Sequence, residues 1–304
     1  MKIAVTGASG FIGGAVATAL ADLDHEVVGF GRRPDGWTHP HARYRRWDVG
    51  TGPVRADRDF DAVVHCAALA DDWADRDSAL RVNRDGTRAV VRSFPHARIV
   101  HLSTSSVYDP FEPSVEIGED QSPVRRHLSF YSETKTLAEF ELAGTDAVIL
   151  RPHGVYGQGD TTLLPRILAG VRRGRLVLPE GAEVRHSLTS IDNLVLAVRR
   201  ALDPVSPRGT YNIADDTPVL LSAMLRELLE RRGVSARLVA IPYGAAFALA
   251  GTLEAAARLT RTRPRLTRYA VSQLGMERTL DLRAAREHLG YRPAPTSLAG
   301  AETW

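Results

Sequence analysis

Short apolar runs alternate with amphipathic segments along most of this 304-residue chain. A continuous run such as 3–5 is typical of a strand buried on both faces of a parallel sheet. Apolar residues three or four positions apart, as in Ile12, Val16 and Leu20, indicate a helix that packs on one side. The expected strands are 3–5, 25–30, 43–47, 61–69, 98–108, 145–150 and 210–214. The expected helices are 12–23, 131–140, 161–171, 194–202, 222–233 and 245–259.

Three glycines, Gly7, Gly10 and Gly13, separate the first expected strand from the first helix. Glycine permits positive φ, close approach of a ligand to the backbone and tight packing of helix on strand. The start of the helix offers unpaired N–H groups and the positive end of its dipole to a pyrophosphate. The spacing TGxxGxxG differs from the commonest fingerprint, but its place between strand and helix favours a dinucleotide site over a simple tight turn.

The end of the second expected strand bears on the choice of cofactor. An NAD-selective fold usually has an acidic residue there, which binds the ribose 2′-hydroxyl. This chain has Gly31, followed by Arg32 and Arg33. Guanidinium groups suit a 2′-phosphate, so we expect NADP, with NAD as the alternative. The competing interpretation is that both arginines are solvated loop residues.

Composition and charge exclude several classes of protein. Hydrophobic residues make up 44% of the chain and charged residues 25%, as in ordinary globular proteins. There is no run of eighteen apolar residues and no leader pattern, so we expect a cytoplasmic protein without a membrane partner. Cys66 is the single cysteine, which excludes an internal disulfide and a thiolate metal cluster. The net charge is +3, and the basic stretch 258–268 has no interleaved aromatics, so nucleic acid is not an expected partner.

Tyr131 and Lys135 are the first candidates for catalysis. Of 39 basic residues only Lys2 and Lys135 are lysine, and lysine differs from arginine in that its pKa can shift. Residues four apart share one face of a helix. Hydride transfer at a carbinol or carbonyl carbon needs a matched proton transfer at its oxygen. A phenol with a pKa near 10 is a poor base at neutral pH, and we expect the neighbouring ammonium to lower that pKa.

These motifs together resemble the extended short-chain dehydrogenase/reductase family, also called the NAD-dependent epimerase/dehydratase family. The resemblance is carried by the opening 6–13, the hydroxyl cluster 103–106 at a strand end, Tyr131 and Lys135, and it covers nearly the whole chain. The tail, in 264–269 and 278–281, is most similar to the 3β-hydroxysteroid dehydrogenase-like branch. In that branch the tail closes over a hydrophobic substrate.

The resemblance implies a role for further residues. It makes Thr104 the hydroxyl that holds the substrate oxygen, with Ser105 as a substitute, and it places Asp48 near the adenine. The implied catalytic residues are Thr104, Tyr131 and Lys135. The cofactor-binding residues are Gly7, Gly10, Phe11, Ile12, Gly13, Arg32, Arg33, Asp48, Val49, Ala67, Ala68, Leu69, Asn83, Tyr131, Lys135 and His153. The substrate-binding residues are Thr104, Ser105, Tyr131 and Arg185, and no metal site is expected.

Some of these residues have a plainer explanation. Asp48 fits a surface turn and Asn83 an exposed helix position. His153 suits either a polar lining of the site or a buried, hydrogen-bonded histidine. Arg185 suits either a substrate phosphate or a nearby carboxylate. Cys66 is more consistent with packing than with a nucleophile, because no feature indicates a low thiol pKa.

The fold class that follows is α/β. We expect a doubly wound parallel sheet of the Rossmann type with a smaller, interleaved, mostly helical substrate-binding region. The NAD(P)-binding domain is assigned to 1–152 plus 188–216, and the substrate-binding region to 153–187 plus 217–304. The resemblance also implies a homodimer, paired through the helices that carry Asn83 and Tyr131.

Three functions compete. The first is an NAD(P)-dependent oxidoreductase that acts on a secondary alcohol or ketone, such as a β-keto acid or sterol-like small molecule, with Tyr131 as general acid and base. The second is a nucleotide-sugar 4-epimerase that keeps NAD tightly bound. Arg185 favours it, whereas the arginine pair and Gly154, where such enzymes commonly have asparagine, oppose it. The third is a binding module or redox sensor without turnover, which the intact Tyr131, Lys135 and Thr104 set opposes.

Overall fold

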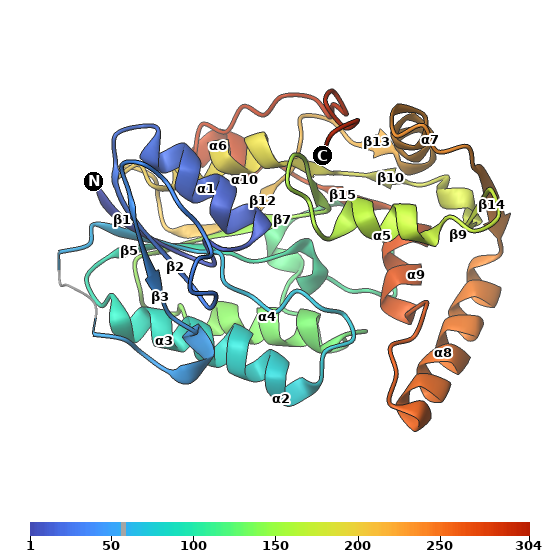
Figure 1. Cartoon of the computed structure of the whole chain (residues 1–304), viewed down its shortest axis with the longest axis horizontal. Coiled ribbons are helices and arrows are strands. Elements are labelled where there is room, and N and C mark those ends of the chain that lie inside the picture. Colours follow the sequence, from blue (N-terminus) through green and yellow to red (C-terminus); the bar gives the residue numbers. More distant parts are fainter. Residues whose placement is uncertain (56–58) are drawn as a thin grey trace.

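Seven parallel strands form the central sheet of the computed structural model, which describes residues 1–55 and 59–304 (Figure 1). Their order is β12-β7-β5-β4-β1-β2-β3, so the chain reverses its direction of travel across the sheet between β1 and β4. Ligands of open α/β sheets bind at such a switch point, beyond the carboxyl ends of the strands. The strands are β1 Lys2–Thr6, β2 Glu26–Gly31, β3 Arg43–Arg46, β4 Ala62–His65, β5 Arg98–Leu102, β7 Ala147–Pro152 and β12 Gly209–Ile213.

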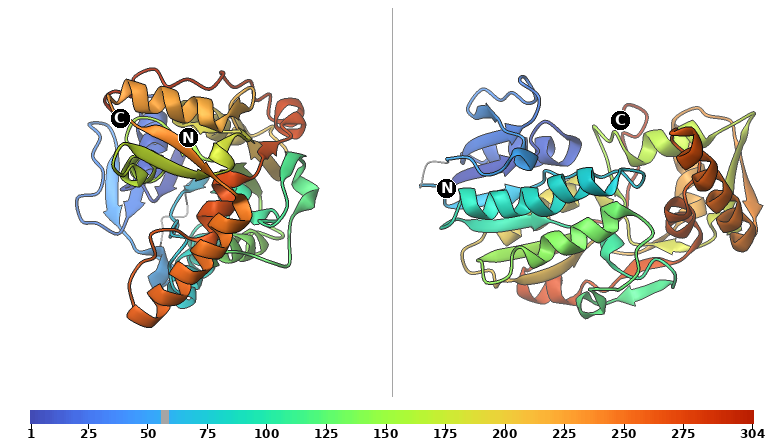
Figure 2. Two further views of the ribbon diagram at one scale, coloured as in Figure 1. Left: turned by 90° about the vertical axis from the view of Figure 1, so that its right-hand side faces the viewer. Right: turned by 90° about the horizontal axis from the view of Figure 1, so that it is seen from below.

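Helices cover both faces of this sheet, which confirms the expected fold class. On one face Ile3 and Val5 pack with α1, α6 and α10, and on the other Ala4 packs with the segment that contains α3 (Figure 1). Seen from below, α4 runs alongside the α2–α3 segment (Figure 2). The helices are α1 Phe11–Ala21, α2 Arg76–Ala79, α3 Asp85–Ser93, α4 Phe130–Phe140, α6 Ile191–Ala201 and α10 Arg283–His288, and the π-helical turn Leu80–Arg84 joins α2 to α3.

A second region lies beyond the carboxyl ends of these strands (Figure 1). It contains a four-stranded sheet in the order β13-β10-β15-β6, together with the parallel pairs β14–β9 and β11–β8. Its strands are β6 Ser114–Ile117, β8 Val155–Tyr156, β9 Arg175–Pro179, β10 Arg185–His186, β11 Thr189–Ser190, β13 Val219–Leu220, β14 Arg237–Ile241 and β15 Arg278–Leu280. Its helices are α5 Leu163–Gly170, α7 Leu221–Arg231, α8 Tyr243–Thr260 and α9 Arg268–Gly275.

Two segments lie across the division that the sequence suggested. Strand β6 precedes α4 in the chain but pairs with β15 of the second region. Helix α10 comes from the tail, but Ala285 packs it into the core on the face of the large sheet that α1 and α6 cover. The assignment of 1–152 plus 188–216 to one domain stays a prediction, and these two segments show that the regions interleave more than it describes.

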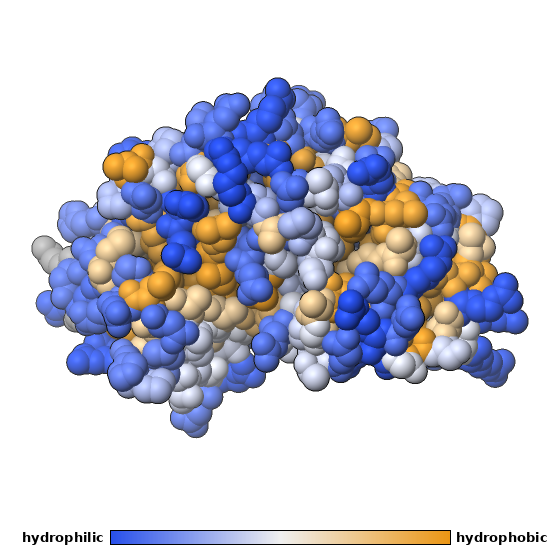
Figure 3. All heavy atoms as spheres, turned by 90° about the horizontal axis from the view of Figure 1, so that it is seen from above, coloured by the Kyte–Doolittle hydropathy of each residue, from blue (hydrophilic) through white to orange (hydrophobic). Residues whose placement is uncertain are grey.

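The outer surface carries mixed polarity. Figure 3 shows the face that bears α1 and α6, where polar side chains are interspersed with apolar ones. Among the described residues, no helix is both long enough and apolar enough to cross a bilayer.

Candidate active site

The glycine loop has the geometry that a dinucleotide requires. Gly7 has φ +73°, in the region that favours glycine, and a Cβ there would lie 2.8 Å from the backbone nitrogen of Ala67. A Cβ on Gly13 would lie 2.2 Å from the carbonyl oxygen of Gly7, so the start of α1 packs directly on the loop. Gly10 occupies the N-cap of α1 without a side-chain cap. The first N–H groups of the helix are therefore available to an anion.

A cavity of about 310 Å³ opens at this loop. It lies at the switch point, between the carboxyl ends of β1, β2 and β4. Nine residues that the sequence suggested for the cofactor line it: Gly7, Gly10, Arg32, Arg33, Asp48, Val49, Ala67, Ala68 and Leu69. Ser9, Gly31, Trp47, Cys66 and Val82 line it as well and were not named as cofactor-binding residues. Each of these five residues is directly adjacent in the sequence to a residue that was named, and sequence analysis could have found them by that adjacency.

A side chain at the end of β2 would meet two neighbouring hydroxyl groups. A Cβ on Gly31 would lie 2.6 Å from the hydroxyl of Tyr44 and 2.7 Å from the hydroxyl of Ser9. Both following arginines are exposed at the cavity. The guanidinium of Arg33 donates to the carbonyl of Ser9, whereas no partner is recorded for the guanidinium of Arg32 in the described part of the chain.

The segment that follows β4 forms an uncharged wall of the cavity. Burial raises the pKa of the Cys66 thiol to about 12, and the opposing effect of Lys135 is smaller, so this group packs as a neutral thiol.

Asn83 is buried, and its amide oxygen accepts from the backbone nitrogen of Leu69 at 2.7 Å. Its amide nitrogen donates to the hydroxyl of Thr134 in α4 at 2.9 Å. Asn83 therefore ties the cavity wall to α4, and the alternative of an exposed asparagine is wrong.

Helix α4 carries the catalytic candidates. Its N-cap is Ser129, whose side chain accepts from the backbone nitrogen of Ser132 at 3.2 Å. Lys135 is buried, and its Nζ donates to the carbonyl of Leu102 at 2.6 Å and lies 3.1 Å from Nε2 of His101. Burial lowers the pKa of Lys135 to about 8, against smaller upward effects of Glu139 and Cys66. An ammonium has three donors, so one remains for a ligand.

Tyr131 lies beside Thr104 at the carboxyl end of β5. Burial raises the pKa of the Tyr131 phenol, and a hydrogen bond with Thr104 opposes that rise. Lys135 is not among the groups that shift this pKa, so the expectation that its ammonium lowers the pKa of Tyr131 gains no support here. The ammonium is bonded to the end of β5 instead, and desolvation of the phenol dominates.

The hydroxyls at the strand end point to different partners. Thr104 Oγ1 accepts from the backbone nitrogen of Ser106 and donates to Ser106 Oγ, each at 3.1 Å. Ser105 Oγ lies 2.8 Å from Nδ1 of His153, whose Nε2 lies 3.1 Å from Nδ1 of His186. Burial holds the pKa of His153 well below its usual value. His153 is thus a neutral, hydrogen-bonded histidine, and Thr104 rather than Ser105 is the hydroxyl next to Tyr131.

Arg185 is placed apart from these groups. It is exposed on β10 and donates to the carbonyl of Pro218 at 3.2 Å. In the described part of the chain it pairs with no carboxylate, so the ion-pair alternative is wrong. Phe11, Ile12 and Gly13 lie in the first turn of α1 and do not line the cavity, and neither do Asn83, Tyr131, Lys135 and His153.

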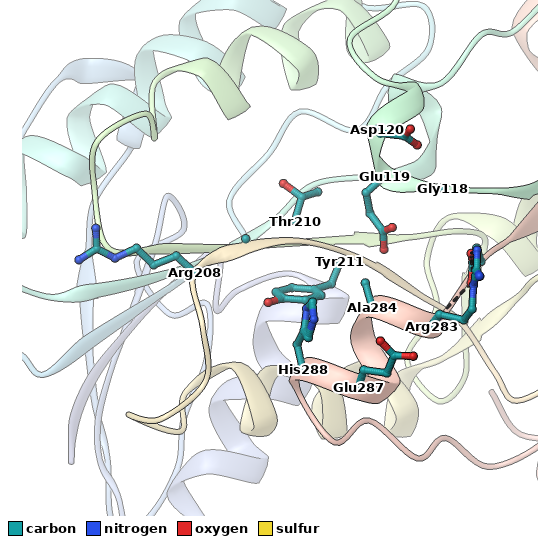
Figure 4. A pocket seen from close by; sticks show the side chains of 12 residues that line it. Gly118, Glu119, Asp120, Arg208, Thr210, Tyr211, Arg283, Ala284, Glu287 and His288 are labelled. Atoms are coloured by element: carbon teal, nitrogen blue, oxygen red, sulfur yellow. Dashed lines mark hydrogen bonds and ion pairs between the residues drawn. The ribbon is translucent and has the colours of Figure 1, made fainter.

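A larger hollow of about 550 Å³ lies at the opposite edge of the sheet, beside β12 and α10 (Figure 4). None of the candidate site residues lines it. Two of its charged groups have partners: Arg283 pairs with Asp281, and Glu119 accepts from the backbone nitrogen of Asn212. We therefore assign the cofactor to the smaller cavity at the glycine loop, because its residues fit a dinucleotide.

Comparisons with known proteins agree with this geometry. The sequence pattern of the NAD dependent epimerase/dehydratase family matches residues 3–214. A 2-alkyl-3-oxoalkanoate reductase of Stenotrophomonas maltophilia is 32% identical over 96% of this chain and 95% of its own. A 3 beta-hydroxysteroid dehydrogenase/Delta 5-->4-isomerase of Mycobacterium tuberculosis is 28% identical over 97% of this chain and 87% of its own. The structure of a UDP-glucuronic acid 4-epimerase from Bacillus cereus with NAD has a TM-score of 0.74 at 23% identity, covering 100% of this chain and 97% of its own.

The order of deprotonation in this site is testable. Lys135 has its pKa near 8, whereas that of Tyr131 is raised above its usual value, so the ammonium is lost before the phenol ionises. We therefore expect Lys135→Met to move the ionisation midpoint of Tyr131 by less than about half a pH unit, and Thr104→Val to raise it. The midpoint is read from tyrosinate absorbance as the difference between each protein and its Tyr131→Phe counterpart. A rise of a full unit in Lys135→Met would contradict this.

Proposed function

The chain belongs to the NAD-dependent epimerase/dehydratase family and is an oxidoreductase, and we propose that it reduces the ketone of an apolar 3-oxo compound with NADPH. The observation that supports the proposal is that Lys135, one helical turn after Tyr131 on α4, is bonded to the carboxyl end of β5, where the Thr104 hydroxyl acts on the Tyr131 phenol. Its relatives include a 2-alkyl-3-oxoalkanoate reductase and a 3 beta-hydroxysteroid dehydrogenase, which share an oxygen function at position 3.

The cofactor would be held by residues of the glycine-loop cavity. The N–H groups at the start of α1 would bind the pyrophosphate, Asp48 and Val49 would border the adenine, and the remaining donor of Lys135 would hold a ribose hydroxyl. When bound, the nicotinamide supplies or accepts a hydride.

The protein supplies the proton. Burial keeps the phenol of Tyr131 protonated at neutral pH, which suits a general acid. In the direction of reduction Tyr131 gives its proton to the carbonyl oxygen as the carbon gains the hydride, and in oxidation it takes that proton back. Thr104 holds the same oxygen with its hydroxyl. The ketone thus gains a hydride at its carbon and a proton at its oxygen, and becomes a secondary alcohol. Tyr131 is left as a phenolate until it takes up another proton.

NADP is the cofactor we favour. A side chain at Gly31 would have to displace the hydroxyls of Tyr44 and Ser9, which disfavours the acidic residue that would select NAD. Arg32 lies exposed at the cavity, where its guanidinium can reach a 2′-phosphate. The hydrogen bond from Arg46 Nε to the carbonyl of Arg32, at 3.2 Å, fixes the backbone of this loop.

A nucleotide-sugar 4-epimerase is supported less well. Gly154 has φ +52°, and a Cβ there would lie 2.8 Å from Cδ2 of Leu188, so an asparagine at this position would have to displace the Leu188 side chain. Arg185, the candidate for a sugar phosphate, is exposed and bonded to a carbonyl in the second sheet. The epimerase structures among its neighbours are under 25% identical and therefore support the fold alone.

We also propose a cytoplasmic homodimer with a small-molecule substrate. The expected pairing surface includes α4, and Phe130 and Phe140 of that helix are exposed, at 42% and 56% of their surface. Exposed aromatic side chains on one helix suit a symmetric contact between two copies.

Turnover tests the main proposal. The purified protein should release no bound nucleotide and should consume NADPH with a 2-alkyl-3-oxoalkanoate or a 3-oxosteroid. We expect Tyr131→Phe to lower kcat at least about 100-fold because the proton donor is lost. The matched control is Tyr211→Phe. Tyr211 lies in the edge strand β12, and its hydroxyl donates to the carbonyl of Pro207. Tightly held NAD together with interconversion of nucleotide sugars would establish the epimerase instead.

Cofactor selectivity has its own test. We expect Arg32→Ala to raise KM for NADPH about 10-fold or more and to leave KM for NADH unchanged, because a charge-assisted hydrogen bond contributes about 1.5–3 kcal/mol. Arg43→Ala is the control and should change neither value, because Arg43 lies at the amino end of β3 and does not line the cavity. An equal effect of Arg32→Ala on both cofactors, or a wild-type preference for NADH, would refute the NADP assignment.

A further inference from the structure

We propose that Tyr269, in the tail helix α9, is a positioning residue for the reaction: through Ser106 it fixes the hydroxyl of Thr104 and thus the place of the substrate oxygen. The inference rests on the proposed function, because it gives Thr104 the role of holding that oxygen. Tyr269 lies 138 positions after Tyr131 in the chain, and neither the sequence motifs nor the relatives assign it a role.

The contact that carries the inference is a chain of hydroxyls. The phenol oxygen of Tyr269 lies 2.7 Å from Ser106 Oγ, and either atom can donate. Ser106 Oγ accepts from Thr104 Oγ1 at 3.1 Å, and the backbone nitrogen of Ser106 donates back to Thr104 Oγ1 at 3.1 Å. The Thr104 hydroxyl lies next to the Tyr131 phenol and lowers its pKa. The tail is therefore joined to the catalytic tyrosine by two intervening hydroxyls.

Tyr269 is held in place by buried polar contacts at the start of α9. Thr267 is the N-cap of α9 and accepts from the backbone nitrogen of Ala270 at 3.0 Å. Its hydroxyl donates to Asp72 at 2.6 Å, and the Asp72 side chain is only 2% exposed. Arg166 of α5 pairs with the same carboxylate at 2.8 Å. Because Asp72 follows β4, the helix that carries Tyr269 is fixed against the cofactor-binding half of the molecule.

The direction of the hydrogen bonds gives Tyr269 its effect. Burial raises the pKa of the Tyr269 phenol and nearby Tyr131 raises it further, so Tyr269 keeps its proton in the pH range of catalysis. When a ligand oxygen or the Tyr131 phenolate takes the hydrogen that Thr104 otherwise donates to Ser106 Oγ, Ser106 can turn its own hydrogen to Thr104 Oγ1 while Tyr269 donates to Ser106 Oγ. Thr104 can then direct its hydrogen to a ligand oxygen or to the phenolate of Tyr131. Linked hydroxyls polarise one another, so the end of the chain influences its other end.

Tyr269→Phe keeps the ring of Tyr269 and removes its hydroxyl. The variant therefore distinguishes a role in packing, which needs only the ring, from a role in the hydroxyl chain. We expect kcat to fall about 10-fold, with KM for NADPH unchanged, and the ionisation midpoint of Tyr131 in the free protein to rise. Ser106→Ala should have the same effects, and the double variant should be no worse than either single variant, because each breaks the same chain. Tyr243→Phe in α8 of the tail is the matched control and should change neither quantity.

The outcomes separate this inference from the proposed function. Unchanged kcat and an unchanged Tyr131 midpoint in Tyr269→Phe would overturn it, as would additive effects in the double variant. A lower melting temperature as the sole effect would show that Tyr269 is structural and would also overturn it. Full turnover in Tyr131→Phe would refute the proposed function instead. The Tyr131 midpoint is measured without substrate or cofactor, so the hydroxyl chain is tested even then.

Discussion

The candidate site depends on the attachment of helix α4 to the sheet through buried polar groups. Lys135 donates to the carbonyl at the end of β5, and Glu139 accepts from Arg151 of β7 through two nitrogens at 2.6 and 3.0 Å. Buried polar groups are costly unless they are paired, so these contacts allow one placement of the helix and penalise others. That placement puts Tyr131 beside Thr104. The position of the phenol thus depends on contacts one and two turns further along the same face of its own helix.

The same burial sets the charges in the site. It raises the pKa of Tyr131 and lowers that of Lys135 to about 8, so the phenol stays neutral at a pH where the ammonium begins to lose its proton. A neutral phenol is a proton donor, which is the form of Tyr131 that reduction of a ketone requires. Burial likewise keeps the Tyr269 hydroxyl protonated, so the chain of hydroxyls that ends at Thr104 starts from a neutral donor.

The sequence predicted what depends on local spacing. The glycine loop, the alternation of strands and helices, and the Tyr131–Lys135 pair on one helix face follow from periods of a few residues, and the structure has all three. Contacts between distant segments were not predictable in this way. The bond of Lys135 to β5, the partner of His153 and the approach of Tyr269 to Ser106 each need the tertiary fold. The expected effect of Lys135 on the Tyr131 pKa stays a prediction for the same reason, since spacing along a helix does not show which group an ammonium meets.

A crystal structure of the protein with NADP bound tests the account most directly. We expect the pyrophosphate at the start of α1, the 2′-phosphate against Arg32, and the nicotinamide beside Tyr131 and Thr104, with Lys135 still bonded to the carbonyl of Leu102. Tyr131 turned away from the nicotinamide, or a nucleotide bound elsewhere than the glycine-loop cavity, would contradict the claim that the attachment of α4 builds the active site.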